Sequence, residues 1–133
     1  MKLSDYVAQK SVEHGVKHVF MVTGGGAMHL NHSLGTHEDL ECIFNHHEQA
    51  CAIGAEAYYR QSNRLPIVNV TSGPGGTNTI TGVYGAWVDS IAISVLSTFP
   101  SSAFFAALAL LVSAAFLAFS LFLSNCNCFS DII

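Results

Sequence analysis

The chain has few positive charges. It carries five lysines and arginines among 133 residues, against nine aspartates and glutamates, and its formal net charge is -4. The cations form no cluster, whereas a nucleic-acid-binding surface needs a basic patch or stripe to neutralise phosphates. The composition therefore excludes nucleic acid as the expected partner.

Cysteine pairs at metal-binding or redox spacing are also lacking. The four cysteines stand at positions 42, 51, 126 and 128, and no C-x-x-C motif occurs. These spacings indicate neither a disulfide framework nor a zinc site, so we expect free thiols in a reducing compartment. The adjacent His46 and His47 point to different sides of a helix, and we expect no metal site there.

The N-terminus lacks the apolar core of a secretion signal. This predicts a cytoplasmic chain that is not secreted through this segment. The sequons at Asn31 and Asn69 are then expected to be chance matches, because such sites matter only in secreted proteins.

Charge is nearly absent from the last part of the chain. Of fourteen charged side chains, thirteen lie at or before Asp89, and only Asp131 follows. We expect two regions, an ordinary globular domain over residues 1–97 and an apolar helical tail over 98–133. Residues 103–123 carry no charge and are long enough for a transmembrane helix of about 20 residues, but no flanking cation orients it. A membrane helix, an apolar helix packed on the domain and an aberrant end remain three open interpretations of the tail.

Predicted strands and helices alternate along residues 1–97. This order predicts an α/β fold with a parallel sheet and helices on both faces. In such sheets ligands bind at the carboxyl ends of the strands. The predicted helices are 5–14, 27–34, 44–60 and 79–88, and the predicted strands are 18–22, 40–44, 66–71 and 91–97.

Two glycine-rich turns follow predicted strands at that edge. T-G-G-G-A occupies 23–27, and T-S-G-P-G-G-T-N occupies 71–78. The second lacks the Gly-Lys-Ser/Thr ending of a P-loop and the last glycine of a dinucleotide fingerprint. Backbone N–H groups near a helix N-terminus suit an anion or a polar heterocycle, but a plain connection explains the turn equally well.

A glutamate, Glu48, lies near the start of the third predicted helix, and two interpretations are open. Asn45 is a good N-cap, and Glu48 three residues later completes a capping box. Alternatively, the small residues Ala50, Gly54 and Ala57 let another backbone approach the helix. Glu48 would then be partly desolvated, and its pKa would rise toward values useful for proton transfer.

Two longer segments, FNHHEQACAIGAEAYYR (44–60) and VNVTSGPGGTNTITGVYGAWVDSI (68–91), carry a family resemblance. Together they resemble the N-terminal pyrimidine-binding domain of thiamine-diphosphate enzymes, and in particular the acetolactate synthase-like group. The resemblance covers about residues 1–97. It implies the fold predicted above, and a glutamate that hydrogen-bonds the aminopyrimidine of the cofactor and promotes deprotonation of the thiazolium.

The resemblance also implies the roles of individual residues. Glu48 would be catalytic, and other residues would line the pyrimidine ring or lie near the reacting carbon, where Gly24 replaces the proline of the family's Pro-Gly-Gly turn. The family decarboxylates a 2-oxo acid and joins the product to a second carbonyl compound. The implied cofactor-binding residues are Gly24, Gly25, Gly26, Glu48, Thr71, Pro74 and Asn78.

The chain departs from the family in what it lacks. The family's Gly-Asp-Gly…Asn motif holds magnesium and the diphosphate, but the chain contains no Gly-Asp pair. We therefore expect a truncated thiamine-diphosphate enzyme, inactive alone. Its magnesium would be held by a domain absent here, and its partner would be a second copy or a chain that supplies the diphosphate-binding domain. A non-catalytic fragment and a membrane-tethered domain are the alternatives.

Overall fold

The four short apolar runs form one sheet in the computed structural model, which describes residues 1–97. The strand order is β2-β1-β3-β4, and every neighbouring pair is parallel. The predicted α/β class with a parallel sheet is confirmed. The strands are β1 (His18–Met21), β2 (Glu41–Phe44), β3 (Ile67–Val70) and β4 (Ser94–Ser97).

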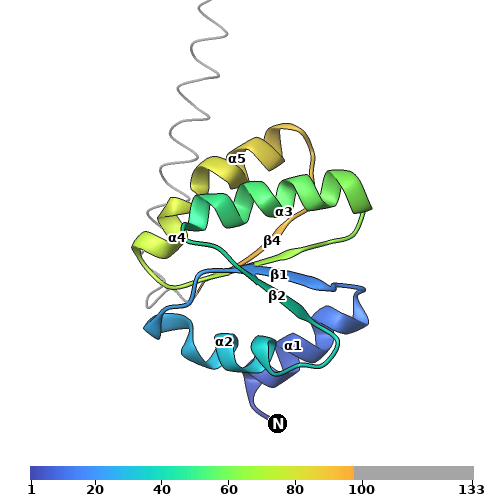
Figure 1. Cartoon of the computed structure of the whole chain (residues 1–133), viewed down its shortest axis with the longest axis vertical. Coiled ribbons are helices and arrows are strands. Elements are labelled where there is room, and N and C mark those ends of the chain that lie inside the picture. Colours follow the sequence, from blue (N-terminus) through green and yellow to red (C-terminus); the bar gives the residue numbers. More distant parts are fainter. Residues whose placement is uncertain (98–133) are drawn as a thin grey trace, which may run out of the picture. The chain divides into compact units, whose positions relative to one another are not determined.

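Helices cover both faces of this sheet, as predicted (Figure 1). The first two pack on one face, and α3 packs on the other, with α5 against α3 (Figure 1). Two short helical segments lie in the connections after β1 and β3. The helices are α1 (Leu3–Glu13), η1 (Gly25–Ala27), α2 (Met28–Gly35), α3 (Glu48–Ser62), α4 (Pro74–Asn78) and α5 (Ile80–Val88).

Strand β3 is buried on both faces, as expected for a central strand of a parallel sheet. Ile67 joins the apolar cluster under α1 and α2 with Val19, whereas Val68 and Val70 pack in the cluster under α3. Because side chains alternate along a strand, Asn69 points to the same face as Ile67. Asn69 is 0% exposed, so a polar amide lies inside an otherwise apolar strand.

Helix α3 begins later than predicted. Its first residue is Glu48, and its N-cap is His47, whose Nδ1 accepts a hydrogen bond from the Gln49 amide at 3.1 Å. The predicted capping box of Asn45 and Glu48 is wrong. The reason is that the backbone N–H of Asn45 donates to the Met21 carbonyl at 3.1 Å, so Asn45 still belongs to the hydrogen-bond ladder of the sheet.

The segment after β3 contains a helical turn where the sequence predicted only a connecting turn. Pro74 is the first residue of α4, a position where its fixed φ suits a helix and its missing N–H leaves no bond unmade. Gly73 precedes it with a φ of 65°, a conformation that favours glycine. Asn78 ends α4, and α5 starts at Ile80.

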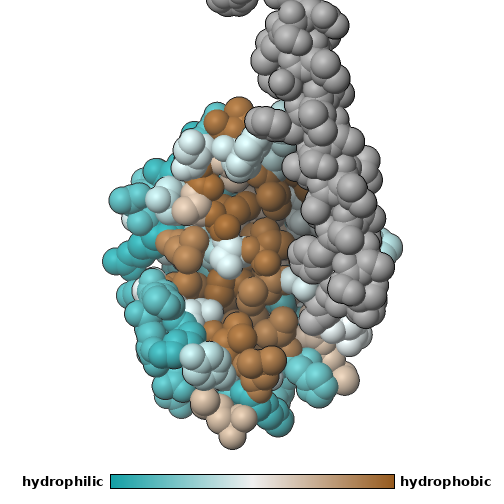
Figure 2. Space-filling model, turned by 180° about the vertical axis from the view of Figure 1, so that it is seen from behind, coloured by the Kyte–Doolittle hydropathy of each residue, from teal (hydrophilic) through white to brown (hydrophobic). Residues whose placement is uncertain are grey.

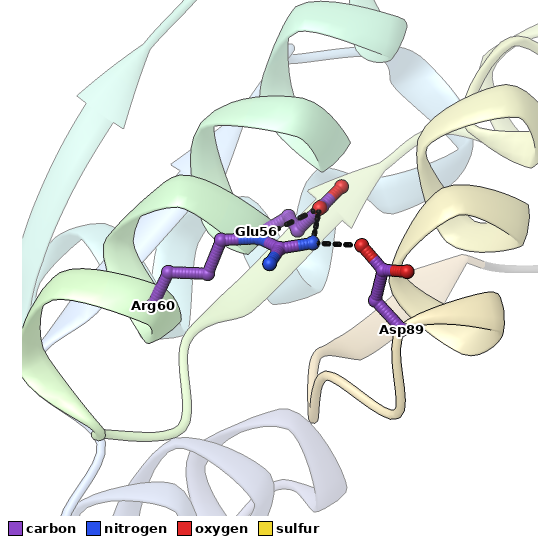
Figure 3. Close-up of polar contacts among 3 residues, drawn as sticks. All are labelled: Glu56, Arg60 and Asp89. Carbon is purple, nitrogen blue, oxygen red and sulfur yellow. Dashed lines mark hydrogen bonds and ion pairs between the residues drawn. The ribbon is translucent and has the colours of Figure 1, made fainter.

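Helices α3 and α5 pack closely, and an ionic cluster joins them. A Cβ atom at Gly82 would lie 2.6 Å from the Ala52 Cβ, so the two helices approach at a distance that only glycine allows. The i, i+4 spacing predicts an exposed pair of Glu56 and Arg60, and Arg60 Nη2 donates to Glu56 Oε1 at 2.7 Å. The same guanidinium also pairs with Asp89 at the end of α5, so the cluster spans both helices (Figure 3).

The small residues of α3 do not form one exposed stripe. Ala50 and Ala57 are exposed, but a Cβ atom at Gly54 would contact the Phe20 ring at 3.4 Å. Because Phe20 belongs to β1, this contact means that Gly54 faces the sheet. Gly54 is rotated by about 40° from Ala50 around the helix, since residues four apart are offset by that angle. Ala50 and Ala57 are the exposed members of the three, and the approach of another backbone to α3 at these residues stays a prediction. The exposed large apolar side chains of α3 and α5 are Ile53, Ile80, Tyr84, Trp87 and Val88.

Strand β4 is an edge of the described sheet. Figure 2 shows the molecule from behind the view of Figure 1, and apolar residues gather near the centre of that face. All residues of β4 are partly exposed. The expected helical tail and the candidate membrane span at 103–123 lie outside the described residues. Within residues 1–97, every helix is too short or too polar to cross a bilayer. The domain boundary after residue 97 and the cytoplasmic location stay predictions.

Candidate functional site

Three connections leave the carboxyl ends of neighbouring strands at one rim of the sheet. Because β1 lies between β2 and β3, the chain first turns to one side of β1 and later to the other. Ligands of open parallel sheets bind outside the carboxyl ends of the strands at such a switch point. The connections are the glycine turn after β1 (residues 24–26), the start of α3 after β2, and residues 71–78 after β3.

The Glu48 carboxylate lies at this rim and is bonded to Asn78. Glu48 is the first residue of α3, and Asn78 is the last residue of α4. Asn78 Nδ2 donates to Glu48 Oε2 at 3.0 Å. The contact joins two connections and brings together two of the residues that the sequence predicted for the site.

The pKa of Glu48 lies below its usual value. The main cause is the hydrogen bond from Asn78, which stabilises the ionised carboxylate. Partial burial acts in the opposite direction but is outweighed. The expectation that desolvation raises this pKa is therefore wrong for the structure, and the carboxylate is an ionised hydrogen-bond acceptor.

Thr71 holds the glycine turn against the end of β3. Its Oγ1 accepts a hydrogen bond from the Gly26 amide at 3.1 Å. A Cβ atom at Gly24 would lie 2.5 Å from the Thr71 Cβ, so Gly24 approaches the threonine too closely for any side chain. Ser97 Oγ donates to the Thr71 carbonyl at 3.0 Å and connects the same residue to β4.

The two halves of the rim meet at Gly75 in α4. A Cβ atom there would lie 2.9 Å from Thr71 Cγ2 and 3.6 Å from Glu48 Oε1. Pro74, one residue earlier, is exposed, and a Cβ atom at Gly25 would have no neighbour within 4 Å. The structure thus brings Gly24 and Gly26 against Thr71, and Glu48 against Asn78, and Gly75 lies between these two groups. Their roles toward a cofactor stay a prediction.

A pair of asparagines supports the glycine turn from below, and the sequence analysis missed it. Asn69 Nδ2 donates to Asn31 Oδ1 at 2.6 Å, and Asn31 Nδ2 donates to the Gly24 carbonyl at 3.3 Å. The signal in the sequence was one polar residue inside the apolar run of β3. Its partner on α2 lies 38 residues away, and no local pattern connects the two.

Within residues 1–97, no group of three or more histidine, cysteine or acidic side chains is arranged to hold a metal ion. The described cysteines, Cys42 and Cys51, are free thiols, and burial raises the pKa of both. The Cys51 thiol accepts a hydrogen bond from the Asn45 side chain at 3.4 Å. These thiols are therefore mainly protonated.

A comparison of the sequence with protein families matches residues 1–109 to the family described as thiamine pyrophosphate enzyme, N-terminal TPP binding domain. The acetolactate synthase large subunit of Buchnera aphidicola (subsp. Acyrthosiphon pisum) is 37% identical over 94 residues, which are 71% of this chain and 16% of that protein. The large subunit of Escherichia coli K12 acetolactate synthase isozyme 3 has the same identity and coverage. The Lactococcus lactis large subunit is 36% identical over the same shares.

Proposed function

Since the chain belongs to the thiamine pyrophosphate enzyme family, as its N-terminal TPP-binding domain, we propose that residues 1–97 form the pyrimidine side of a thiamine diphosphate site. The observation that supports this most is the position of Glu48. A carboxylate at the switch point of the sheet lies beside Gly75, where a Cβ atom would be 3.6 Å from Glu48 Oε1, and Asn78 orients it. We place this site in an enzyme of the acetolactate synthase-like type.

The residues present fit the pyrimidine part of the cofactor. Glu48 presents carboxylate oxygens to a ring nitrogen, and the amide of Asn78 fixes their direction. Thr71 and Pro74 would border the ring, and Gly24 lets the turn pack directly against Thr71, because any side chain at position 24 would overlap it. Bound thiamine diphosphate supplies the electron sink for 2-oxo acid decarboxylation and carboligation. In this scheme, Glu48 holds or releases a proton at its carboxylate, and the surrounding residues orient the ring.

The diphosphate part has no counterpart among the described residues, which hold no metal-binding group. We propose that magnesium and the diphosphate are bound by residues outside 1–133, in a further domain or on another chain. The chain spans 16% of the length of the curated relatives it matches. The activity of the whole enzyme, its 2-oxo acid substrate and its partners are therefore proposals here. A second copy and a chain with a diphosphate-binding domain are the partners that we propose.

Calorimetric titration of the full chain with thiamine, and separately with thiamine diphosphate and magnesium, tests this assignment. If residues 1–97 contact only the pyrimidine side, the two ligands bind with similar, roughly millimolar affinity, because few groups anchor them. A preference of more than about tenfold for the diphosphate with magnesium, equal to 1.4 kcal/mol, would contradict the division of the site.

A matched pair of variants separates specific binding from weak association. Glu48→Gln keeps an acceptor for Asn78 but cannot ionise, and it is expected to abolish thiamine binding. Glu38→Gln makes the same chemical change at an exposed glutamate outside the rim, and it should bind thiamine like the unaltered chain. Equal binding by both variants would remove Glu48 from the site.

A further inference from the structure

The glycine turn is attached to β3 at two levels. Thr71 contacts it directly, through the Gly26 amide and the close approach of Gly24. Asn69 reaches it indirectly, through Asn31 of α2. Asn69 is in β3, and Thr71 follows the last residue of that strand, so both attachments to the turn come from the carboxyl end of β3.

We propose that Asn31 and Asn69 form a positioning pair that fixes the height of the glycine turn above the end of β3. The proposal deepens the proposed function, on which its relevance to a cofactor rests. Asn31 contacts the rim only at the Gly24 carbonyl, and Asn69 reaches it only through Asn31. They act through the Gly24 carbonyl, whose oxygen accepts a hydrogen bond from Asn31 Nδ2 at 3.3 Å.

The chemistry of the groups determines the direction of the hydrogen bonds. A backbone carbonyl only accepts, so Asn31 must turn its NH₂ group to Gly24 and its oxygen to Asn69. Asn69 must then donate its own NH₂ group, at 2.6 Å. The remaining atom, Asn69 Oδ1, is buried and has no hydrogen-bond partner among the described residues. The two side chains thus form a chain of hydrogen bonds from β3 to the glycine turn, with each bond in a fixed direction.

The unpaired oxygen indicates what the pair is for. A buried acceptor without a donor destabilises a protein, and two apolar side chains of the same shape would avoid that penalty. The stability of the core therefore does not require these amides. What apolar replacements could not provide is the bond to the Gly24 carbonyl, whose other partner is the Ala27 amide at 3.1 Å.

The test compares Asn31→Leu with the double variant Asn31→Leu/Asn69→Leu in the full chain. Asn31→Leu leaves the Asn69 amide buried with both polar atoms unpaired, so its unfolding temperature should fall. The double variant removes that amide and should recover most of the loss. In both variants, the Gly26 and Ala27 amides should exchange with solvent roughly fivefold faster, the equivalent of one ordinary hydrogen bond.

The amide exchange separates positioning from a structural role, because stability and exchange should respond differently in the double variant. Exchange at Gly26 and Ala27 as slow as in the unaltered chain would overturn the proposal. A measurement on the unaltered chain needs no variant: the side-chain amide protons of Asn31 should be protected from exchange. Exchange at the rate of a free amide would equally overturn the proposal.

Thiamine titration of the double variant completes the test and keeps the two proposals apart. Faster exchange with weaker thiamine binding supports both the positioning pair and the role of the glycine turn in the site. Faster exchange with unchanged thiamine binding supports the pair but contradicts the assignment of the turn to the cofactor. The exchange measurement needs no ligand, so it decides on the pair even if the chain does not bind thiamine.

Discussion

Alanine at position 24 should destabilise the chain, whereas alanine at position 25 should not. The new methyl carbon at position 24 would lie 2.5 Å from the Thr71 Cβ and 2.8 Å from its Cγ2. Carbon atoms pack at about 3.5–4.0 Å, so the turn must move by roughly 1 Å. Overpacking of this kind costs about 1–3 kcal/mol. The movement also weakens the hydrogen bond from Gly26 to Thr71, which contributes about 1 kcal/mol.

For Gly24→Ala these contributions predict that the free energy of unfolding falls by about 2–4 kcal/mol. For a domain of about 100 residues this lowers the unfolding temperature by roughly 10–25 °C. Thermal unfolding followed by circular dichroism measures the shift. The matched control is Gly25→Ala, whose methyl group would meet no atom within 4 Å and whose φ is not positive. It should be neutral, or more stable by up to about 1 kcal/mol. Equal unfolding temperatures for both variants would refute the close approach of the turn to Thr71.

Two further predictions concern the rim and the exposed helices. Because the pKa of Glu48 is lowered in the folded chain, its contact with Asn78 stabilises the fold above the unfolded pKa and is lost as pH falls through the folded pKa. Urea unfolding measures the free energy of unfolding of the unaltered chain and of Glu48→Gln between neutral pH and about pH 3. As the pH falls, the unaltered chain should lose stability relative to the variant. A difference in unfolding free energy that stays the same at every pH would count against the contact. We expect the proposed second copy to bind the exposed apolar face of α3 and α5, so Trp87→Glu should abolish self-association without loss of stability, since Trp87 is 67% exposed. Sedimentation velocity measures this, with Met28→Glu on α2 as the control, and an unchanged profile for Trp87→Glu would exclude the face as the interface.

The strands and the class of fold could be predicted because their signals are local. Each strand is a short apolar run, and the strictly alternating order of helices and strands leaves few arrangements other than a parallel sheet. The start of α3 could not be predicted as well. Asn45 is the better N-cap by residue preference, but its amide bonds Met21 on the neighbouring strand, and this long-range bond leaves His47 as the cap.

The meeting of the glycine turns and Glu48 at one rim was predictable, but the electrostatics of Glu48 were not. Glycine turns after two strands and a glutamate after a third indicate a common rim from topology alone. The direction of the Glu48 pKa shift depends on Asn78, which lies 30 residues away and donates from the end of a helix that the sequence did not predict. The orientation of Gly54 toward Phe20 likewise depends on how α3 rotates over the sheet, which a pattern of small residues does not specify.

The lowered pKa of Glu48 is compatible with its proposed role in proton transfer, because the lowering depends on the hydrogen bond from Asn78. Two contributions oppose each other at this carboxylate: the Asn78 amide stabilises the ionised form, and burial stabilises the protonated form. In the structure the hydrogen bond is the larger contribution. A flat ring that packs over Thr71 would remove water from the carboxylate, and it would compete with Asn78 for the same oxygens. Both changes would raise the pKa, so under the proposed function Glu48 would take up a proton more readily once a ring lay at the rim, whereas in the structure the carboxylate is ionised and bonded to Asn78.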